Sequence, residues 1–141
     1  MPVQTKAQQD LILAERLISA IPNDNTHQEV RKIYGGLCHS FPILVRTCGL
    51  CQALAFSKDK ATVSEGGSKP RHQAHQLLLD HVAQVLGSPG QDVLALIAKE
   101  SAADYMLHTR RLLSAWIYFK RFAVSILKVE NAKDEENRGN D

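Results

Sequence analysis

The sequence predicts an all-α fold, a single-domain bundle of about five to six helices that ends in a long C-terminal helix. Apolar residues recur at intervals of three and four along almost the whole chain. No stretch shows the alternation of a half-buried strand. The segment from about Ala102 to Lys128 keeps one apolar face for roughly 40 Å at 1.5 Å per residue. A chain of 141 residues can bury such a core without disulfides or metals.

The first two helices are predicted from their start and stop signals. The first is expected from about Thr5 to Ile21, where leucine and isoleucine alternate with polar residues, and the turn at 22–25 ends it. Thr26 is expected to cap the second helix, with Glu29 completing a capping box, and the helix runs through Leu37. The glycine pair Gly35-Gly36 weakens its middle by roughly 1 kcal/mol per glycine relative to alanine.

A third helix is expected from Pro42 to about Phe56. Proline is tolerated in a first turn, where its missing N–H has no partner to lose. Most of this segment is apolar and Arg46 is its one charged residue, so we expect it to be central.

The remaining elements follow from changes in composition. Residues 57–70 are rich in Lys, Ser and Gly and are expected to form a flexible loop. Helices are then predicted at about 71–86, 92–98 and 102–128, and Gly87-Ser-Pro-Gly90 ends the first of these. Residues 1–130 form the single helical domain of this prediction, and the acidic end, 131–141, is expected to be a disordered tail.

The last helix combines an aromatic-rich stripe with a row of cations. At helical spacing one face carries the apolar residues Tyr105, Leu112, Trp116, Phe119, Ala123 and Ile126. Another carries the cations Arg110, Arg121 and Lys128, flanked by Arg111 and Lys120. The aromatic rings could stack on bases, but their spacing favours core packing. A helix that buries one face and holds cations on another is typical of a binding protein rather than an enzyme.

Charge is distributed unevenly along the chain. The net charge is only +2, yet residues 31–72 and 99–128 are basic blocks, while the first thirty residues and the tail lean acidic. The two blocks could form one positive face for a polyanion. The alternative is that these cations only solvate helix surfaces.

Two segments together resemble a known family. The run from Pro42 to Lys60 is similar to the proline, apolar run, Gly-Leu, Gln, Leu-Ala-Phe and lysine pattern of the small subunit of type III-B CRISPR effector (Cmr) complexes. The segment from Tyr105 to Ala123, with Ala115-Trp116-Ile-Tyr-Phe-Lys120-Arg121, resembles the C-terminal signature of that family. The resemblance covers about residues 30 to 128.

The resemblance implies a non-catalytic RNA-binding subunit of an RNA-guided antiviral ribonucleoprotein. Such a subunit stacks along the backbone subunits, associates with itself along the filament, and lines the groove for guide and target RNA. It has the backbone and large subunits as partners. Base pairing between guide and target supplies sequence choice, so the protein needs only shape and phosphate contacts.

Carried over residue by residue, the resemblance implies phosphate contacts at five positions. Arg46, Lys58 and Lys60 belong to the first matching segment, and Lys120 and Arg121 to the second. Which of Lys58 and Lys60 is equivalent to the family lysine stays open. The cysteines of the first segment, Cys48 and Cys51, are not part of the family pattern.

Metal binding and catalysis are the alternatives to a binding surface. The candidate zinc ligands are Cys38, His39, Cys48 and Cys51, but a second C-x2-C is missing, and buried cysteines commonly serve as small apolar residues. On the fourth helix the candidates are His72, His75, His81 and the carboxylate of Asp80. His108 beside two arginines is the one faint nuclease candidate. We expect no metal, no cofactor and no enzymatic activity.

The setting expected from sequence is cytoplasmic. Three cysteines without a secretory signal indicate reduced thiols, and no apolar run is long enough for a membrane span. A helical protein–protein adaptor without nucleic-acid contact is the alternative function.

Overall fold

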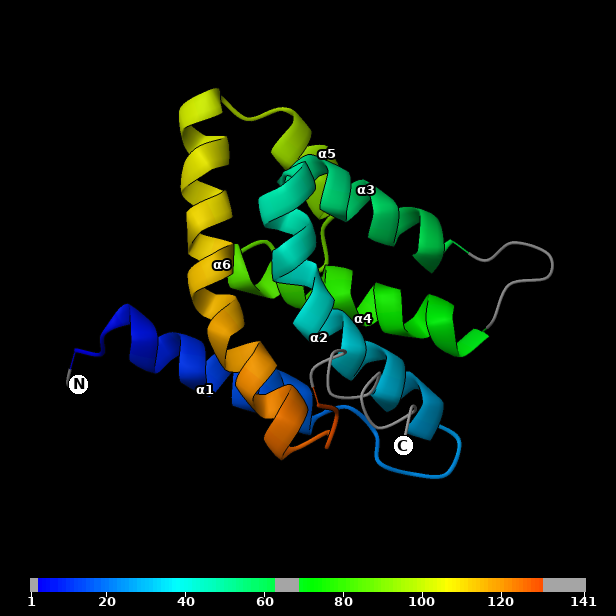
Figure 1. Ribbon diagram of the computed structural model, residues 1–141. Coiled ribbons are helices and arrows are strands. Elements are labelled where there is room, and N and C mark those ends of the chain that lie inside the picture. The colour runs from blue at the N-terminus through cyan, green and yellow to red at the C-terminus, as the bar shows by residue number, and fades with distance from the viewer. Residues whose placement is uncertain (1–2, 63–68, 131–141) are drawn as a thin grey trace.

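The computed structural model describes residues 3–62 and 69–130, and within these ranges the chain forms helices and no strand (Figure 1). The helices are α1 (Lys6–Ser19), α2 (Gln28–Cys48), α3 (Leu50–Ala61), α4 (Lys69–Val85), α5 (Val93–Ala98) and α6 (Ala102–Ser125). The predicted all-α bundle with a long C-terminal helix is confirmed. None of the helices in these ranges combines the length and apolarity that crossing a bilayer requires.

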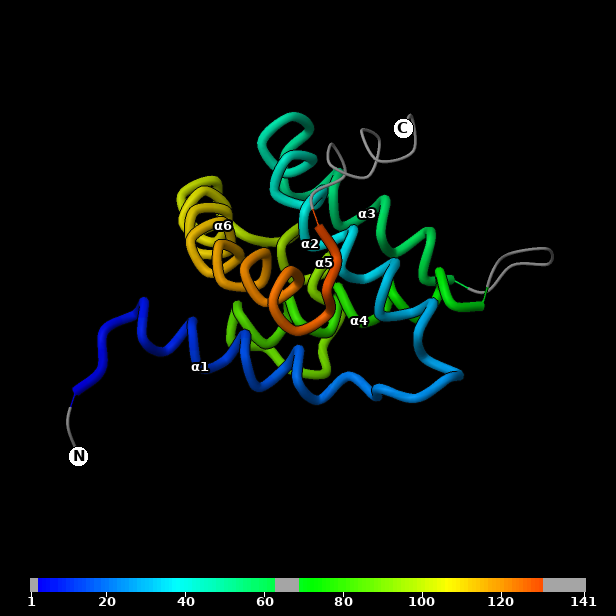
Figure 2. Tube along the Cα trace, turned by 60° about the horizontal axis from the view of Figure 1, so that its bottom comes forward, coloured from blue at the N-terminus to red at the C-terminus, as the bar shows by residue number. Residues whose placement is uncertain are grey.

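Helix α2 occupies the centre of the bundle. It packs against α4, α6 and α3, and it lies between α6 and α3 in both views (Figures 1 and 2). Helix α1 packs on α6 at the outside, and α5 packs on α3 and α4. The largest fully buried side chains include those of Tyr34, Leu54, Leu78, Trp116 and Phe119. The aromatic stripe of the last helix is therefore core, as its spacing predicted.

The prediction that a helix begins at Pro42 is wrong, because Pro42 lies inside α2. A proline within a helix lacks the N–H that would bond to the carbonyl four residues earlier, here that of Cys38. This buried carbonyl instead accepts a hydrogen bond from the indole Nε1–H of Trp116, at 3.1 Å. A side chain of α6 thus replaces the missing donor, and α2 continues.

Helix α2 ends at Gly49, which separates it from α3. Gly49 has φ 87°, a left-handed value that favours glycine. The Tyr105 hydroxyl of α6 lies against this corner and accepts the backbone N–H of Cys51 at 3.1 Å. The segment predicted as one central helix is therefore divided between α2 and α3.

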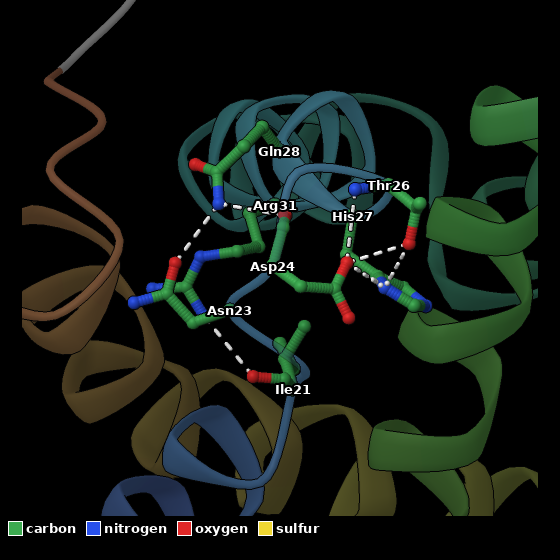
Figure 3. A network of polar contacts seen from close by, with 7 residues as sticks. All are labelled: Ile21, Asn23, Asp24, Thr26, His27, Gln28 and Arg31. Carbon is green, nitrogen blue, oxygen red and sulfur yellow. Dashed lines mark hydrogen bonds and ion pairs between the residues drawn. The ribbon is translucent and has the colours of Figure 1, made fainter.

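The capping box predicted at Thr26 is also absent. The N-cap of α2 is His27, without a side-chain cap. Thr26 and His27 instead bond to the Asp24 carboxylate (Figure 3), with the Thr26 backbone N–H at 2.9 Å and His27 Nδ1 at 2.7 Å. The hydrogen bond from the Thr26 side chain, followed by that from His27, lowers the pKa of Asp24 to about 2. A capping box that was not predicted is present at α1, between Thr5 and Gln8.

The segment predicted as a loop, residues 57–70, is helical at both ends. Helix α3 continues to Ala61 and α4 begins at Lys69. Packing between these helices extends them: Ser57 is buried against His75, and the Lys60 carbonyl bonds to His72 Nδ1 at 2.6 Å. The middle of the predicted loop, 63–68, and the predicted disordered tail, 131–141, lie outside the described residues.

A short segment after α6, residues 126–130, runs back across α2, and we call it the C-terminal strap. The chain turns at Lys128 (φ 61°), and the Val129 N–H donates to the Ala123 carbonyl at 2.9 Å. The Val129 carbonyl bonds to His39 Nε2 at 2.8 Å. A Cβ added at Gly35 would lie 2.5 Å from a Val129 methyl group, so the strap needs glycine there.

Replacing Gly35 with alanine is therefore expected to displace the strap. Alanine favours the helix by roughly 1 kcal/mol, but its methyl group collides with Val129. We expect little or negative change in melting temperature, with faster amide hydrogen exchange at 127–130. Gly36→Ala is the matched control, because no atom lies within 4 Å of its added Cβ. That variant should be stabilised and keep strap protection. Unchanged strap exchange in Gly35→Ala would contradict this account.

Candidate nucleic-acid interface

Lys120 and Arg121 lie together on the C-terminal half of α6. They line a surface hollow of about 700 Å³ between α6, α2 and the strap, which we call the α6 hollow. Its full lining is His39, Ile117, Tyr118, Lys120, Arg121, Val124 and Glu130. Arg121 is exposed and Lys120 is partly buried. No carboxylate within residues 3–62 and 69–130 forms an ion pair with either cation, so both can attract an anion.

A second hollow continues this surface toward α1. It measures about 420 Å³ and shares Ile117 and Tyr118 with the α6 hollow. Its cations include Arg110, of the last helix, and Lys6, from the start of α1. Arg110 and Arg121 are eleven residues apart, about three turns and roughly 17 Å along the same face. That length corresponds to about five nucleotides at 3.4 Å per phosphate along one strand.

Lys58 and Lys60, the two lysines predicted as phosphate contacts, lie on α3 and differ in their surroundings. The Lys58 ammonium is 2.7 Å from Asp92 Oδ2, and this hydrogen bond lowers the pKa of Asp92. Asp92 also caps α5 by accepting the Ala95 N–H. The Lys60 ammonium lies 5.6 Å from the centre of the Phe56 ring, a cation–π contact, and no carboxylate within residues 3–62 and 69–130 forms an ion pair with it. Lys60 is therefore the better placed of the two for a phosphate.

Arg46 is exposed on the last turn of α2, where a cation also interacts favourably with the helix dipole. The structure brings Lys120 and Arg121 into one hollow and places Lys58 and Lys60 at the end of α3. Helix α2 separates these pairs (Figure 1). The five predicted positions thus occupy three neighbouring helices rather than one cluster.

Two cations of the basic blocks have structural partners that sequence could not show. Arg31 is buried, and its guanidinium donates to the carbonyls of Ile21 at 3.1 Å and Ile126 at 3.3 Å; the Ile21 bond is visible in Figure 3. Arg111 forms a bidentate pair with Asp10. Sequence reasoning missed Lys6, because it lies far from both blocks and only the fold brings α1 beside α6.

The alternative zinc ligands do not converge. Cys38 and Cys48 are both on α2, ten residues and so about 15 Å apart. Burial raises the pKa of the Cys38 thiol to about 12, and His39 is bonded to the strap. These side chains cannot supply the ligands of one tetrahedral site.

The histidines of α4 are likewise held by the neighbouring helices. His81 Nδ1 bonds to the Tyr34 hydroxyl, and burial lowers the pKa of His81 to about 4. The pKa of His75 is also about 4, mainly through burial and then through nearby Arg71. These imidazoles are neutral at pH 7 and serve the packing of α4. The described residues contain no group of three His, Cys, Asp or Glu side chains arranged for a metal.

The faint nuclease candidate, His108, lies against a carboxylate. His108 Nδ1 is 2.6 Å from Glu100 Oε1, and both side chains are partly buried. Trp116 and Phe119 are fully buried and stacked with their ring centres 4.3 Å apart, so neither is available to a base. The chemistry that this surface offers is electrostatic attraction of an anion.

Three comparisons with known proteins identify the same family. The model of a family described as CRISPR-associated protein (Cas_Cmr5) matches residues 7–126. A protein of Thermus thermophilus named CRISPR system Cmr subunit Cmr5 is 36% identical over 101 residues, which cover 71% of this chain and 80% of that protein. The crystal structure of a CRISPR-associated Cmr5 family protein from Thermus thermophilus has a TM-score of 0.66 at 28% identity, covering 88% of this chain and 98% of that one.

Proposed function

The chain belongs to the Cmr5 family of CRISPR-associated proteins, and from this premise we propose that it is a non-catalytic, RNA-binding small subunit of a type III-B effector (Cmr) complex. In this proposal it stacks along the backbone subunits, associates with itself along the filament and contacts the large subunit. Its cations line the groove that holds guide and target RNA.

The observation that carries this proposal is the pair Lys120 and Arg121 in the α6 hollow. Two adjacent cations share an open surface and have no ion-pair partner in the described residues. A polyanion gains affinity at such a surface by releasing counterions, with no need for base readout. That is the contact required of a subunit whose complex reads sequence through base pairing.

The other proposed contacts differ in what they require. Arg46 is exposed, and no carboxylate of the described residues pairs with Lys60, so both can contact phosphates directly. Lys58 must first break its ion pair with Asp92, and this cost offsets part of the free energy gained by contacting a phosphate. We therefore propose Arg46, Lys58, Lys60, Lys120 and Arg121 as phosphate contacts, and assign the family lysine to Lys60.

The expected effect of Lys120→Ala/Arg121→Ala is weaker target RNA binding by a complex reconstituted with the backbone subunit and guide RNA. The loss should be about equal for all matched targets, because phosphates carry no sequence. The slope of log affinity against log salt should flatten by roughly 0.7–0.9 for each lost contact. Arg16→Ala, an exposed cation of α1 outside both hollows, is the matched control and should change neither quantity.

An adaptor without RNA contact is the second candidate, and exposed apolar residues on α6 favour it. The side chains of Leu107 and Ile117 are 61% and 62% exposed, and a partner protein could cover them. Unchanged RNA affinity and salt slope in Lys120→Ala/Arg121→Ala, with the subunit still incorporated, would establish the adaptor reading. Loss of incorporation in Ile117→Ser, with RNA affinity of the remaining complex unchanged, would support it further.

A further inference from the structure

We propose that the α6 hollow is also the docking surface for the acidic C-terminal segment of the chain itself, residues 131–141. The segment occupies Lys120 and Arg121 in the unassembled subunit and yields them to RNA in the complex. The docking itself stands on geometry and charge. Only its consequence, competition with RNA, rests on the proposed function.

The strap delivers this segment to the rim of the hollow. Val129 is fixed from three directions: its N–H bonds to Ala123, its carbonyl to His39, and its side chain packs at Gly35. Glu130, the next residue, itself lines the α6 hollow. The segment that follows Glu130 is therefore attached at the hollow that Lys120 and Arg121 line.

The acidic residues of the segment are within reach of both cations. Asp134, Glu135 and Glu136 follow Glu130 by four to six residues, a reach of up to roughly 13–20 Å at about 3.3 Å per residue. Lys120 and Arg121 line the same hollow as Glu130. The chain needs only to double back over the surface on which it starts.

The charges of segment and hollow are complementary. Residues 131–141 carry the acids Asp134, Glu135, Glu136 and Asp141 against the bases Lys133 and Arg138. Three of the acids are consecutive. The hollow offers two adjacent cations, and tethering keeps the effective concentration of the acids in the millimolar range. A contact too weak to form between separate molecules can therefore form within one chain.

Docking and RNA binding exclude each other, because both use Lys120 and Arg121. With an effective concentration of a few millimolar and an intrinsic dissociation constant on the order of 1 mM, the segment lowers the apparent RNA affinity roughly 2- to 10-fold. The device weakens indiscriminate RNA binding by the free subunit. Polyanions held by many subunits in the assembled complex overcome it.

The docking is tested without RNA. The full chain carrying Asp134→Asn/Glu135→Gln/Glu136→Gln, the neutral-tail variant, is titrated at low salt with a synthetic peptide of residues 131–141. We expect shifts of backbone amide resonances at 117–124 in NMR spectra. The shifts should vanish when Lys120→Ala/Arg121→Ala is added and persist with Lys58→Ala. Absence of shifts, or the same shifts without the two cations, would overturn the docking.

The competition is tested by RNA affinity of the isolated subunit. The neutral-tail variant should bind single-stranded RNA roughly 2- to 10-fold more tightly than the unmodified chain, and the gain should disappear with Lys120→Ala/Arg121→Ala. A gain that survives without the two cations would overturn the competition. If the peptide docks but neither the neutral-tail variant nor Lys120→Ala/Arg121→Ala changes the RNA affinity, the RNA role of the hollow fails while the docking stands. If Lys120→Ala/Arg121→Ala weakens RNA binding but the peptide does not dock, the docking fails while the RNA role of the hollow stands.

Discussion

Truncation of Trp116 is expected to be among the most damaging single changes in this chain. The indole is fully buried, stacks on Phe119 and packs against Phe41 with ring centres 5.1 Å apart. Trp116→Ala should lower the free energy of unfolding by about 3–5 kcal/mol, a large share of the stability of a small domain. Denaturant unfolding followed by circular dichroism measures it. Ile117→Ala, one residue further on the exposed face, is the matched control and should change stability by less than about 1 kcal/mol.

The hydrogen bond of Trp116 can be separated from its volume. Trp116→Phe keeps an aromatic ring but leaves the Cys38 carbonyl without a donor, which costs about 1–3 kcal/mol for a buried polar group. In a Pro42→Ala background the backbone N–H at position 42 is restored and can serve that carbonyl. The cost of Trp116→Phe should therefore be smaller there, and the difference is read from a double-mutant cycle. Equal costs in both backgrounds would show that the indole does not replace the missing helix donor.

Removal of the Asp10 carboxylate is expected to release α1. Asp10 is 4% exposed, and Arg111 donates to its two oxygens at 2.8 and 2.6 Å. The other buried residues of α1 are Ala14 and Ile18, with Leu13 and Leu17 partly buried, so this pair is a major polar part of its attachment. Asp10→Ala leaves a partly buried guanidinium without a counterion, a loss of about 3 kcal/mol.

Amide exchange locates this loss. Residues of α1 should lose protection in Asp10→Ala while α2 and α4 keep theirs, because α1 packs mainly on α6. Glu15→Ala, an exposed acid of the same helix, is the matched control. Replacing both partners, Asp10→Leu with Arg111→Met, should recover much of the stability, since no charge is then left buried. A double variant as unstable as Asp10→Ala would show that the pair is not what holds α1.

Sequence alone located most of the helices and the family. Periodicity placed the helices observed as α1, α4, α5 and α6 within a few residues, because helix hydrogen bonds are local and each helix buries one stripe. The aromatic stripe was assigned to the core for the same reason. The five proposed phosphate contacts were also named from the sequence, because two short segments of the chain resemble the family pattern.

Only the tertiary structure decided how particular residues are used, because their partners lie far away in sequence. Pro42 was expected to begin a helix by a sound local rule, and the Trp116 indole, 78 residues from Cys38, overrode it. In the sequence Arg31 and Lys58 resemble ordinary surface cations. In the structure Arg31 donates to the Ile126 carbonyl, and Lys58 pairs with Asp92. Gly35 reads as a weak point of a helix, yet it is the gap into which Val129 fits. Local patterns determine which segments become helices, whereas non-local contacts determine which charges stay available to a partner.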